Sequence, residues 1–244
     1  MDSGFYATFT GLAAQAQTLD LLANNIANAS TIGFKGQRAF YRAITASVAG
    51  ANLSPLNRAM NNFSVLGGGN LDLRQGSLER TGNDLDVAIE GGAFLSVQTP
   101  AGIRFTRAGS LHLDPTLHLL NADGAPVLGQ QGPIQLPPGP VSIGPDGTIS
   151  AGGAVADRLR LTEFPPGTEL TPEGNANFSA PAGTEKPAAS SQVVEGSLET
   201  SNVSPVEGTV TLIQLQRHFE MLERTLSIFH NVFDESAAEV LPRV

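Results

Sequence analysis

The chain has 244 residues, a formal net charge of -9 and 41% hydrophobic residues, a hydrophobic content that is ordinary for a globular protein with a buried core. The charge argues against nucleic acid as a partner, because its binding needs clustered Lys and Arg, and this chain has only 14 of them, scattered along its length. Cysteine is absent, which excludes disulfides, zinc–thiolate sites, iron–sulfur clusters and thiol nucleophiles.

Residues 1–34 predict a helix with a narrow apolar seam. Apolar residues recur at alternating spacings of four and three, the heptad pattern of a helix that packs along another helix. The seam residues are Phe5, Phe9, Leu12, Ala16, Leu19, Ala23 and Ile26. The segment lacks a basic leader and an unbroken apolar run, so we expect no cleaved secretory signal, and no stretch is long and apolar enough for a membrane anchor.

Three asparagines interrupt the end of this helix, in the stretch "LLANNIANASTIGFKG" at residues 21–36. Asparagine is a poor residue for a helix interior because its amide competes for nearby backbone hydrogen bonds. We interpret Asn24, Asn25 and Asn28 as groups that bond adjacent helices or backbone, although Asn28 alone could simply be a frayed helix end. Gly33 is expected to adopt a positive φ where the chain leaves the helix.

The middle of the chain changes from helical to strand periodicity. Residues 35–74 include a glycine run and predict an extended arm, whereas residues 75–200 alternate with a period of two and carry turn signals such as "NADG" at 121–124 and "GPDG" at 144–147. No helical pattern lies between the turns, which favours antiparallel β-structure over βαβ units. Two related segments, "QGSLERTGNDLD" and "EGSLETSNVSP", could pair as neighbouring strands where the β-rich part begins and ends.

Residues 201–244 predict a second seam helix. Its apolar residues, spaced by three and four, are Leu212, Leu215, Phe219, Leu222, Leu226, Phe229 and Phe233. Pro205 suits the first turn, whereas Gly208 and Thr209 weaken the start of the helix. The alternative for each seam is an ordinary core-facing helix. Seams at both ends favour a fold that is mainly β with α. It consists of a discontinuous coiled-coil-like stem, formed by the N- and C-terminal helices, and an antiparallel β-rich middle domain.

Catalytic and metal-binding constellations are not expected. The four histidines, His112, His118, His218 and His230, have no i, i+3 or i, i+4 neighbour among themselves. The glycine run at 67–69 lacks the Lys-Ser or Lys-Thr of a phosphate loop. Asp84 and Asp86 share a face of an expected strand but are more typical of a solvated face than of a carboxylate pair. We therefore expect no enzyme, no catalytic residue, no cofactor and no metal.

The stretch "LANNIANASTIGFKG" closely resembles the N-terminal signature of the bacterial flagellar rod, hook and hook-associated axial proteins. The resemblance continues through "LDVAIEGGAFLSVQTPAGIRFTRAGSLHLD" and "EGSLETSNVSPVEGTVTLIQLQRHFEMLERTLSIF", so that it covers nearly the whole chain. Within the family, "MDSGFYATFTGL" and "RHFEM" are most similar to proximal-rod proteins, with distal-rod proteins as the runner-up.

This resemblance implies a structural subunit that is exported by the flagellar type III apparatus and polymerises through its terminal helices into a torque-transmitting tube. The implied partners are other copies of itself, sister rod proteins and the export apparatus, with no nucleic acid, no small-molecule substrate and no membrane anchor. A secreted adhesin or scaffold module is the alternative from another class. The expected interface residues are Phe5, Phe9, Leu12, Ala16, Leu19, Ala23, Asn24, Asn25, Ile26, Asn28, Gly33, Phe34, Leu212, Leu215, Phe219, Leu222, Leu226 and Phe229.

Overall fold

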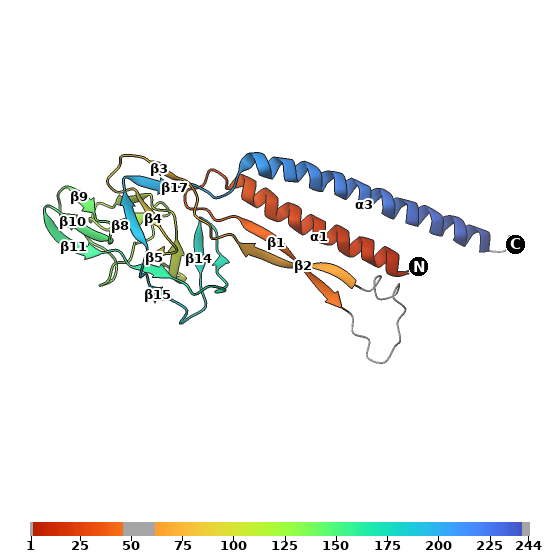
Figure 1. Cartoon of the computed structure of the whole chain (residues 1–244), viewed down its shortest axis with the longest axis horizontal. Coiled ribbons are helices and arrows are strands. Elements are labelled where there is room, and N and C mark those ends of the chain that lie inside the picture. The colour runs from red at the N-terminus through yellow and green to blue at the C-terminus, as the bar shows by residue number, and fades with distance from the viewer. Residues whose placement is uncertain (1, 46–61, 241–244) are drawn as a thin grey trace. The chain divides into compact units, whose positions relative to one another are not determined.

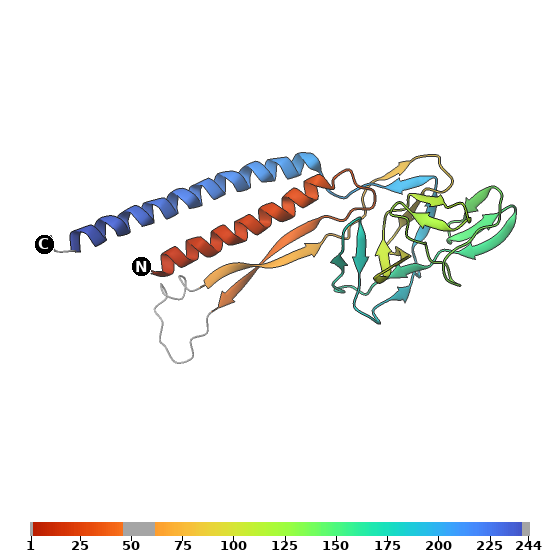
Figure 2. The same cartoon turned by 180° about the vertical axis from the view of Figure 1, so that it is seen from behind.

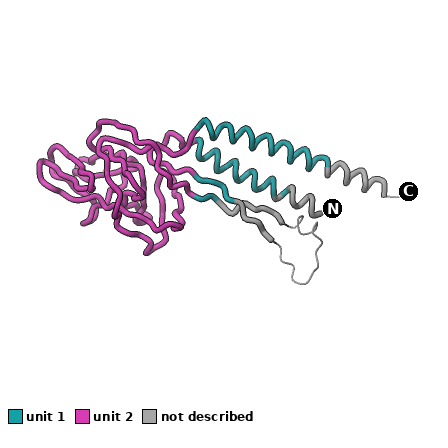
Figure 3. Tube along the Cα trace, in the orientation of Figure 1, with its two compact units in different colours: residues 1–26, 37–70, 205–244 teal, residues 27–36, 71–204 magenta. Residues whose placement is uncertain are grey.

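A computed structural model describes residues 2–45 and 62–240 of the chain (Figures 1 and 2). The chain divides into two compact units (Figure 3). Unit 1 comprises residues 1–26, 37–70 and 205–244, and unit 2 comprises residues 27–36 and 71–204. The chain therefore passes between the units four times, and each unit is built from segments that are distant in the sequence.

Unit 1 contains two long helices and a β-hairpin. The helices are α1 (Asp2–Ala27) and α3 (Pro205–Val240), and the hairpin pairs β1 (Gln37–Thr45) with β2 (Asn62–Leu71). The hairpin falls in the segment that the sequence predicts to be an extended arm, of which residues 46–61 lie outside the described part of the chain. Figures 1 and 2 show α1 running beside α3 in the opposite direction.

The glycine near the start of α3 has a packing role. The sequence suggests that Gly208 weakens the start of the helix, yet α3 begins at Pro205 and continues through it. A Cβ at position 208 would lie 2.8 Å from Cγ1 of Ile26 and would also approach Leu22, both on α1. Gly208 therefore lets the two helices approach closely. This contact offsets the free energy of about 1 kcal/mol by which glycine is less favourable than alanine inside a helix.

Unit 2 is a set of short antiparallel strands, as the sequence predicts. Its strands are β3 (Leu78–Arg80), β4 (Val87–Glu90), β5 (Phe94–Thr99), β6 (Gly102–Thr106), β7 (Leu111–Leu113), β8 (Leu119–Asn121), β9 (Val141–Ile143), β10 (Thr148–Ala151), β11 (Ala154–Arg158), β12 (Leu161–Glu163), β13 (Thr171–Pro172), β14 (Asn177–Ser179), β15 (Lys186–Pro187), β16 (Gln192–Glu195) and β17 (Ser197–Glu199). Six form a sheet in the order β13-β14-β6-β5-β12-β15, three form β11-β10-β9, and the pairs are β16-β4, β17-β3 and β7-β8.

Local turns and one long-range pairing agree with the sequence. Gly124 and Gly147 close the two predicted turns by donating to the carbonyl oxygens of Asn121 (2.9 Å) and Gly144 (2.8 Å). The two related segments pair through β3 and β17, with Leu198 opposite Glu79, so that prediction is confirmed. The pairing of β4 was not foreseeable from its own sequence, because its partner is β16, about a hundred residues further along the chain.

The expectation that Asp84 and Asp86 share a strand face is wrong. Strand β4 begins only at Val87, and both aspartates precede it. Asp84 is exposed in a turn, whereas Asp86 is buried and accepts a hydrogen bond from the Asn83 side-chain amide at 3.0 Å. The side chain of Asn83 bonds its neighbours and holds the residues before Val87 in a turn, so the strand begins only at Val87.

The core of unit 2 has an aliphatic part and an aromatic part. The aliphatic part gathers residues from most of the strands, with Ile149, Leu119 and Val97 fully buried. The aromatic part is built around Phe94, Phe105 and Phe178, and Phe164 packs edge-on against Phe105 with ring centroids 4.9 Å apart. Burial of these side chains supplies the main driving force for folding unit 2, at about 25 cal/mol per Å² of apolar surface.

We predict that unit 2 loses stability in acid, because the pKa values of three of its carboxylates are lowered on folding. Arg104 lowers the pKa of Glu173, the Thr148 hydroxyl lowers the pKa of Asp146, and the backbone N–H of His118 lowers the pKa of Asp114. Groups whose pKa falls on folding stabilise the folded state above their unfolded pKa, and this contribution disappears as the pH falls through the folded value. The thermal midpoint should therefore hold down to about pH 5 and fall below about pH 4. Calorimetry on wild type and Asp114→Asn across this pH range tests the prediction. The thermal midpoint of the variant should fall less steeply in acid, and an identical slope would contradict the contribution of Asp114.

Candidate assembly surface and a buried ion-pair cluster

The inner face of α1 contacts both other elements of unit 1. Toward α3, the Gln15 side-chain amide donates to the carbonyl oxygen of Leu215 at 3.4 Å. Toward the hairpin, Asn25 exchanges two hydrogen bonds with the backbone of Gln37, donating at 2.7 Å and accepting at 2.8 Å. Asn25 thus pairs with the first residue of β1 as a neighbouring strand would, so the amide of this asparagine bonds the chain's own backbone.

The signature residues that follow α1 are part of unit 2. Asn28 comes directly after the helix, where its carbonyl oxygen accepts from the Thr31 N–H at 3.0 Å and its side chain accepts from the Thr31 hydroxyl at 3.2 Å. Gly33 has a φ of 67°, so the positive φ predicted from the sequence is confirmed. Its N–H donates to the carbonyl oxygen of Glu199 at 2.8 Å, and Phe34 is half-buried.

The seam of α3 faces inward as a single strip. Its described residues are all half-buried and are Leu212, Leu215, Phe219, Leu222 and Leu226. The side chain of Phe229 lies outside the described residues, as does that of Phe5 on α1.

The seam of α1 divides into two rows. Leu12, Leu19 and Ile26 are half-buried, whereas Phe9, Ala16 and Ala23 are exposed. The division arises because α1 contacts α3 on one side and the hairpin on another, which turns every second seam position away from both.

Two exposed faces remain on the helices, and the sequence revealed only part of them. The "alanine face" of α1 consists of Phe9, Ala13, Ala16, Asp20 and Ala23. The "outer row" of α3 consists of Val206, Val210, Ile213, Arg217, Met221, Arg224 and Ile228. The outer row has a spacing of four and three like the inner seam, but its two arginines interrupt the apolar pattern and hide it from a search for apolar repeats.

A cluster of three buried charges lies within unit 2 next to Gly33. Nζ of Lys35 is 2.5 Å from Oε1 of Glu199, and Nη1 of Arg107 is 3.1 Å from Oε2 of the same carboxylate. The side chains of Lys35 and Glu199 are fully buried, and that of Arg107 is 2% exposed. Arg107 also donates to the carbonyl oxygens of Ile89 and Gly91, and its guanidinium lies over the Phe94 ring.

The electrostatics of the cluster depend on Glu199. Burial is the largest effect on both cations and lowers the pKa of Lys35 and the pKa of Arg107, while the Glu199 carboxylate opposes it in each case. Two buried cations face one carboxylate, so Glu199 is the group that makes the burial of both tolerable. Lys35 additionally donates to the carbonyl oxygen of Arg74 at 2.8 Å, and the Gly76 N–H donates to Glu199 at 2.8 Å.

Asn202 adds three hydrogen bonds to the backbone segments around the cluster. Its side-chain oxygen accepts from the Gly36 N–H at 2.9 Å, and its amide donates to the carbonyl oxygens of Asp72 (2.6 Å) and Arg74 (3.0 Å). Together with Lys35 and Glu199 it ties residues 33–36, 72–76 and 199–202, which are the parts of unit 2 next to three of the four chain passages. Sequence reasoning missed all three residues, because a buried Lys, Glu or Asn has no local pattern that distinguishes it from an exposed one.

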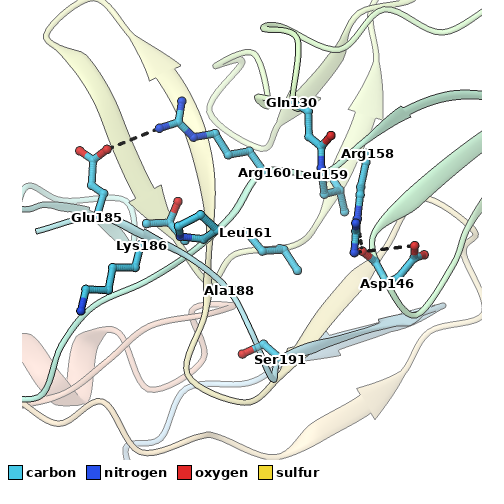
Figure 4. Close-up of a pocket in the computed structure, with 12 residues that line it drawn as sticks. Gln130, Asp146, Arg158, Leu159, Arg160, Leu161, Glu185, Lys186, Ala188 and Ser191 are labelled. Atoms are coloured by element: carbon cyan, nitrogen blue, oxygen red, sulfur yellow. Dashed lines mark hydrogen bonds and ion pairs between the residues drawn. The ribbon is translucent and has the colours of Figure 1, made fainter. Parts of the chain in front are cut away.

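Unit 2 also has an open pocket of about 470 Å³ (Figure 4). Its charged groups are largely paired, Arg160 with Glu185 at 3.5 Å and Arg158 with Asp146 at 3.7 Å. Ser191 donates to Glu163 at 2.7 Å and accepts from the Ala93 N–H at 3.1 Å, which are the bonds of a loop anchor. The bonds of Arg158, Arg160 and Ser191 in this pocket are those of a structural surface.

The described residues contain no group of three His, Asp or Glu side chains placed to hold a metal ion. None of the helices in this part of the chain is long and apolar enough to cross a membrane.

Comparison with known proteins places flagellar family models along the chain. The model "Flagella basal body rod protein" matches residues 5–35, "Flagellar hook protein FlgE/F/G D1 domain" matches residues 88–151, and "Flagellar basal body rod FlgEFG protein C-terminal" matches residues 194–238. The first and last of these ranges contain most of α1 and α3, together with Lys35 and Glu199 of the buried cluster.

Curated relatives match over nearly their full length. The basal-body rod protein FlgF of Mesorhizobium japonicum is 33% identical over 226 residues, 90% of each chain. FlgF of Salmonella typhimurium is 34% identical over 242 residues, 91% of this chain and 93% of the relative. The rod protein FlgG of Buchnera aphidicola from Schizaphis graminum is 31% identical over 243 residues, 89% and 92% of the two chains.

Two paired terminal helices, a β-rich middle and full-length relatives define one class: the chain belongs to the flagellar basal-body rod protein family. The resemblance found in the sequence is thereby confirmed. Within the family the chain is FlgF-like, since FlgF proteins from several bacteria match it at 31–34% identity and FlgG proteins at 27–31%.

Proposed function

We propose that this protein is a structural subunit of the proximal part of the flagellar basal-body rod, where it polymerises through its terminal helices into the axial tube that transmits torque. The observation that carries the proposal is the relationship to FlgF over 90% of both chains, helices included. Its partners are other copies of itself and sister rod proteins, and it reaches them through the flagellar type III export apparatus. It works as a building element and has no catalytic role.

The parts of the chain have separate tasks in this proposal. Residues 1–34 and 201–244 form the coiled-coil-like stem that lies in the inner tube, and residues 75–200 form the outer β-rich domain, with residues 35–74 as the connecting arm. The exposed apolar side chains of both helices support it, because a helix pair with unpartnered apolar faces gains stability when neighbouring subunits cover them.

Deleting the gene in its motile host tests the function. The deletion should abolish swimming and leave basal bodies without a complete rod in electron micrographs, and the intact gene should restore both. FlgG proteins match the chain at somewhat lower identity, which makes a distal-rod subunit the alternative. Basal bodies that lack the proximal part of the rod support the proximal assignment, and those that keep the proximal part but lack the distal part support the alternative. Intact rods in the deletion strain would refute both.

Enlarging the alanine face is predicted to block assembly without unfolding unit 2. Ala16→Leu adds an isobutyl group to an exposed position of α1, where it gains no partner in the monomer and obstructs a closely packed neighbour. Swimming in soft agar should be lost, while the unfolding midpoint of unit 2 stays at the wild-type value. Thr211→Leu, on an exposed side of α3 that belongs to neither the seam nor the outer row, is the matched control and should swim. A motile Ala16→Leu strain would contradict the interface assignment.

A further inference from the structure

We infer that the outer row of α3 in one copy of the chain packs on the alanine face of α1 in a neighbouring copy, with Arg217 against Asp20. This inference rests on the proposed function and adds to it which two surfaces meet and which charges select the contact.

The alanine face is a flat surface with one charge at its centre. At about 100° per residue, Phe9, Ala13, Ala16 and Ala23 all project within about 60° of Asp20. Asp20 is exposed, and Asp2 is the only other charged residue of α1, which has no Lys or Arg at all. Small side chains allow a second helix to approach closely, so an apolar strip of a partner can cover this face if the partner neutralises Asp20.

The outer row of α3 has the complementary character. Val206, Ile213, Met221 and Ile228 are 74%, 47%, 56% and 63% exposed, which is unusual for a file of large apolar side chains along one helix. Arg217 and Arg224 are the only Lys or Arg residues of α3, and both lie in this row. A shallow groove lies beside the row and is lined by Arg217, Met221 and Arg224 together with Gln214, His218 and Glu220.

The spacing of the two faces matches around the proposed ion pair. Phe9, Ala13, Ala16 and Asp20 are separated by four, three and four residues, as are Val206, Val210, Ile213 and Arg217. Val210 and Ile213 on one helix thus meet Ala13 and Ala16 on the other in the same sequence of steps, and the row ends at a charge of opposite sign. Opposite charges flanked by apolar contacts select the partner and the register more than they add affinity.

The two faces are not used between α1 and α3 of one chain, and we assign their occupant to a second copy. Within one chain, α1 and α3 meet through Gln15, Leu215, Gly208 and Ile26, and the seam residues of α3 are half-buried. The alanine face and the outer row are exposed on the same helices, so they are not part of that contact. A contact between two different surfaces of identical chains is heterologous, and repeated it gives an open-ended assembly rather than a closed dimer.

Charge reversal in the motile host tests the ion pair. Asp20→Arg places like charges together, as does Arg217→Asp, and each should reduce the swimming rate by about tenfold or more. The double variant Asp20→Arg/Arg217→Asp restores the pair with its signs exchanged and should recover most of the rate. Single variants that swim normally, or a double variant no better than the singles, would overturn the inference.

Cysteine cross-linking tests the packing independently of motility. Because the chain has no cysteine, each introduced thiol is unique. In the native host, rods are built from a mixture of two single-cysteine chains. One chain carries Ile213→Cys, and the other carries either Ala16→Cys or Ala23→Cys. Ala16 and Ala23 flank Asp20, so the two mixtures cover both helix directions. One mixture should give oxidised dimers at about tenfold the yield of a control in which Thr211→Cys replaces Ile213→Cys; equal yields would overturn the inference.

The two levels of failure are distinguishable. If the wild-type gene fails to restore rods in the deletion strain, the proposed function is wrong whatever the variants do. If the wild-type gene restores rods and the Ile213→Cys mixtures cross-link no better than the control, the rod assignment stands and only the packing of these two faces is wrong.

Discussion

Glu199→Gln should destabilise unit 2 by about 3–5 kcal/mol, the usual cost of removing one partner from a buried ion pair. The substitution preserves shape but leaves Lys35 and Arg107 buried without a counter-charge, and it weakens the acceptor of the Gly76 N–H. For a unit of this size the thermal midpoint should fall by roughly 10 °C or more. Thermal and urea unfolding followed by circular dichroism measure the change.

A matched control and a partial rescue make this result specific. Glu79→Gln removes an exposed carboxylate on β3, the strand paired with β17, and should change stability by less than about 0.5 kcal/mol. Adding Lys35→Met to Glu199→Gln removes one of the two unpaired cations and should recover part of the loss. If Glu199→Gln unfolds at the wild-type midpoint, the carboxylate does not carry the charge balance of the cluster.

Gly33→Ala should cost about 2–4 kcal/mol, for two separable reasons. The φ of 67° lies in the left-handed region, which is unfavourable for alanine. In addition, an added Cβ would lie within 3.0 Å of the backbone of Arg107 and Ala108, so the loop must move and the hydrogen bond to Glu199 must weaken. Urea unfolding of unit 2 measures the total.

Gly82→Ala separates the two contributions. Gly82 also has a positive φ, 76°, but nothing lies within 4 Å of an added Cβ there, so its replacement should cost only the backbone strain of about 1–2 kcal/mol. The difference between the two variants is the cost of the steric clash with residues 107–108. Equal losses of stability would show that the loop around Gly33 adapts without cost, so that Gly33 is required only for its positive φ.

The cluster gives the signature loop a physical role that its sequence conceals. Residues 33–36 enter unit 2 through Gly33, Lys35 and Gly36, each bonded to residues 199–202. The hydrogen bond from Lys35 to Glu199 is charge-assisted, and such hydrogen bonds are stronger than those between neutral groups.

Local signals in the sequence determined the helices, the turns and the class of the middle domain. The three-four spacing of the terminal segments, the turns at 121–124 and 144–147 and the positive φ at Gly33 are each properties of a few neighbouring residues, so they can be derived from one chain. The pairing of β3 with β17 was also within reach, because both strands carry the same short motif.

Only the tertiary structure decided the features that depend on partners distant in the sequence. The spacing of Phe9, Ala16 and Ala23 indicates a contact face but does not say that Leu12, Leu19 and Ile26 turn inward instead. Gly208 looks unfavourable until Ile26 lies against it, and Lys35 and Glu199 look like solvated charges until the fold buries them 164 positions apart in sequence. Periodicity records which residues share a side of a helix or strand, whereas burial and charge pairing depend on what the rest of the chain places against that side.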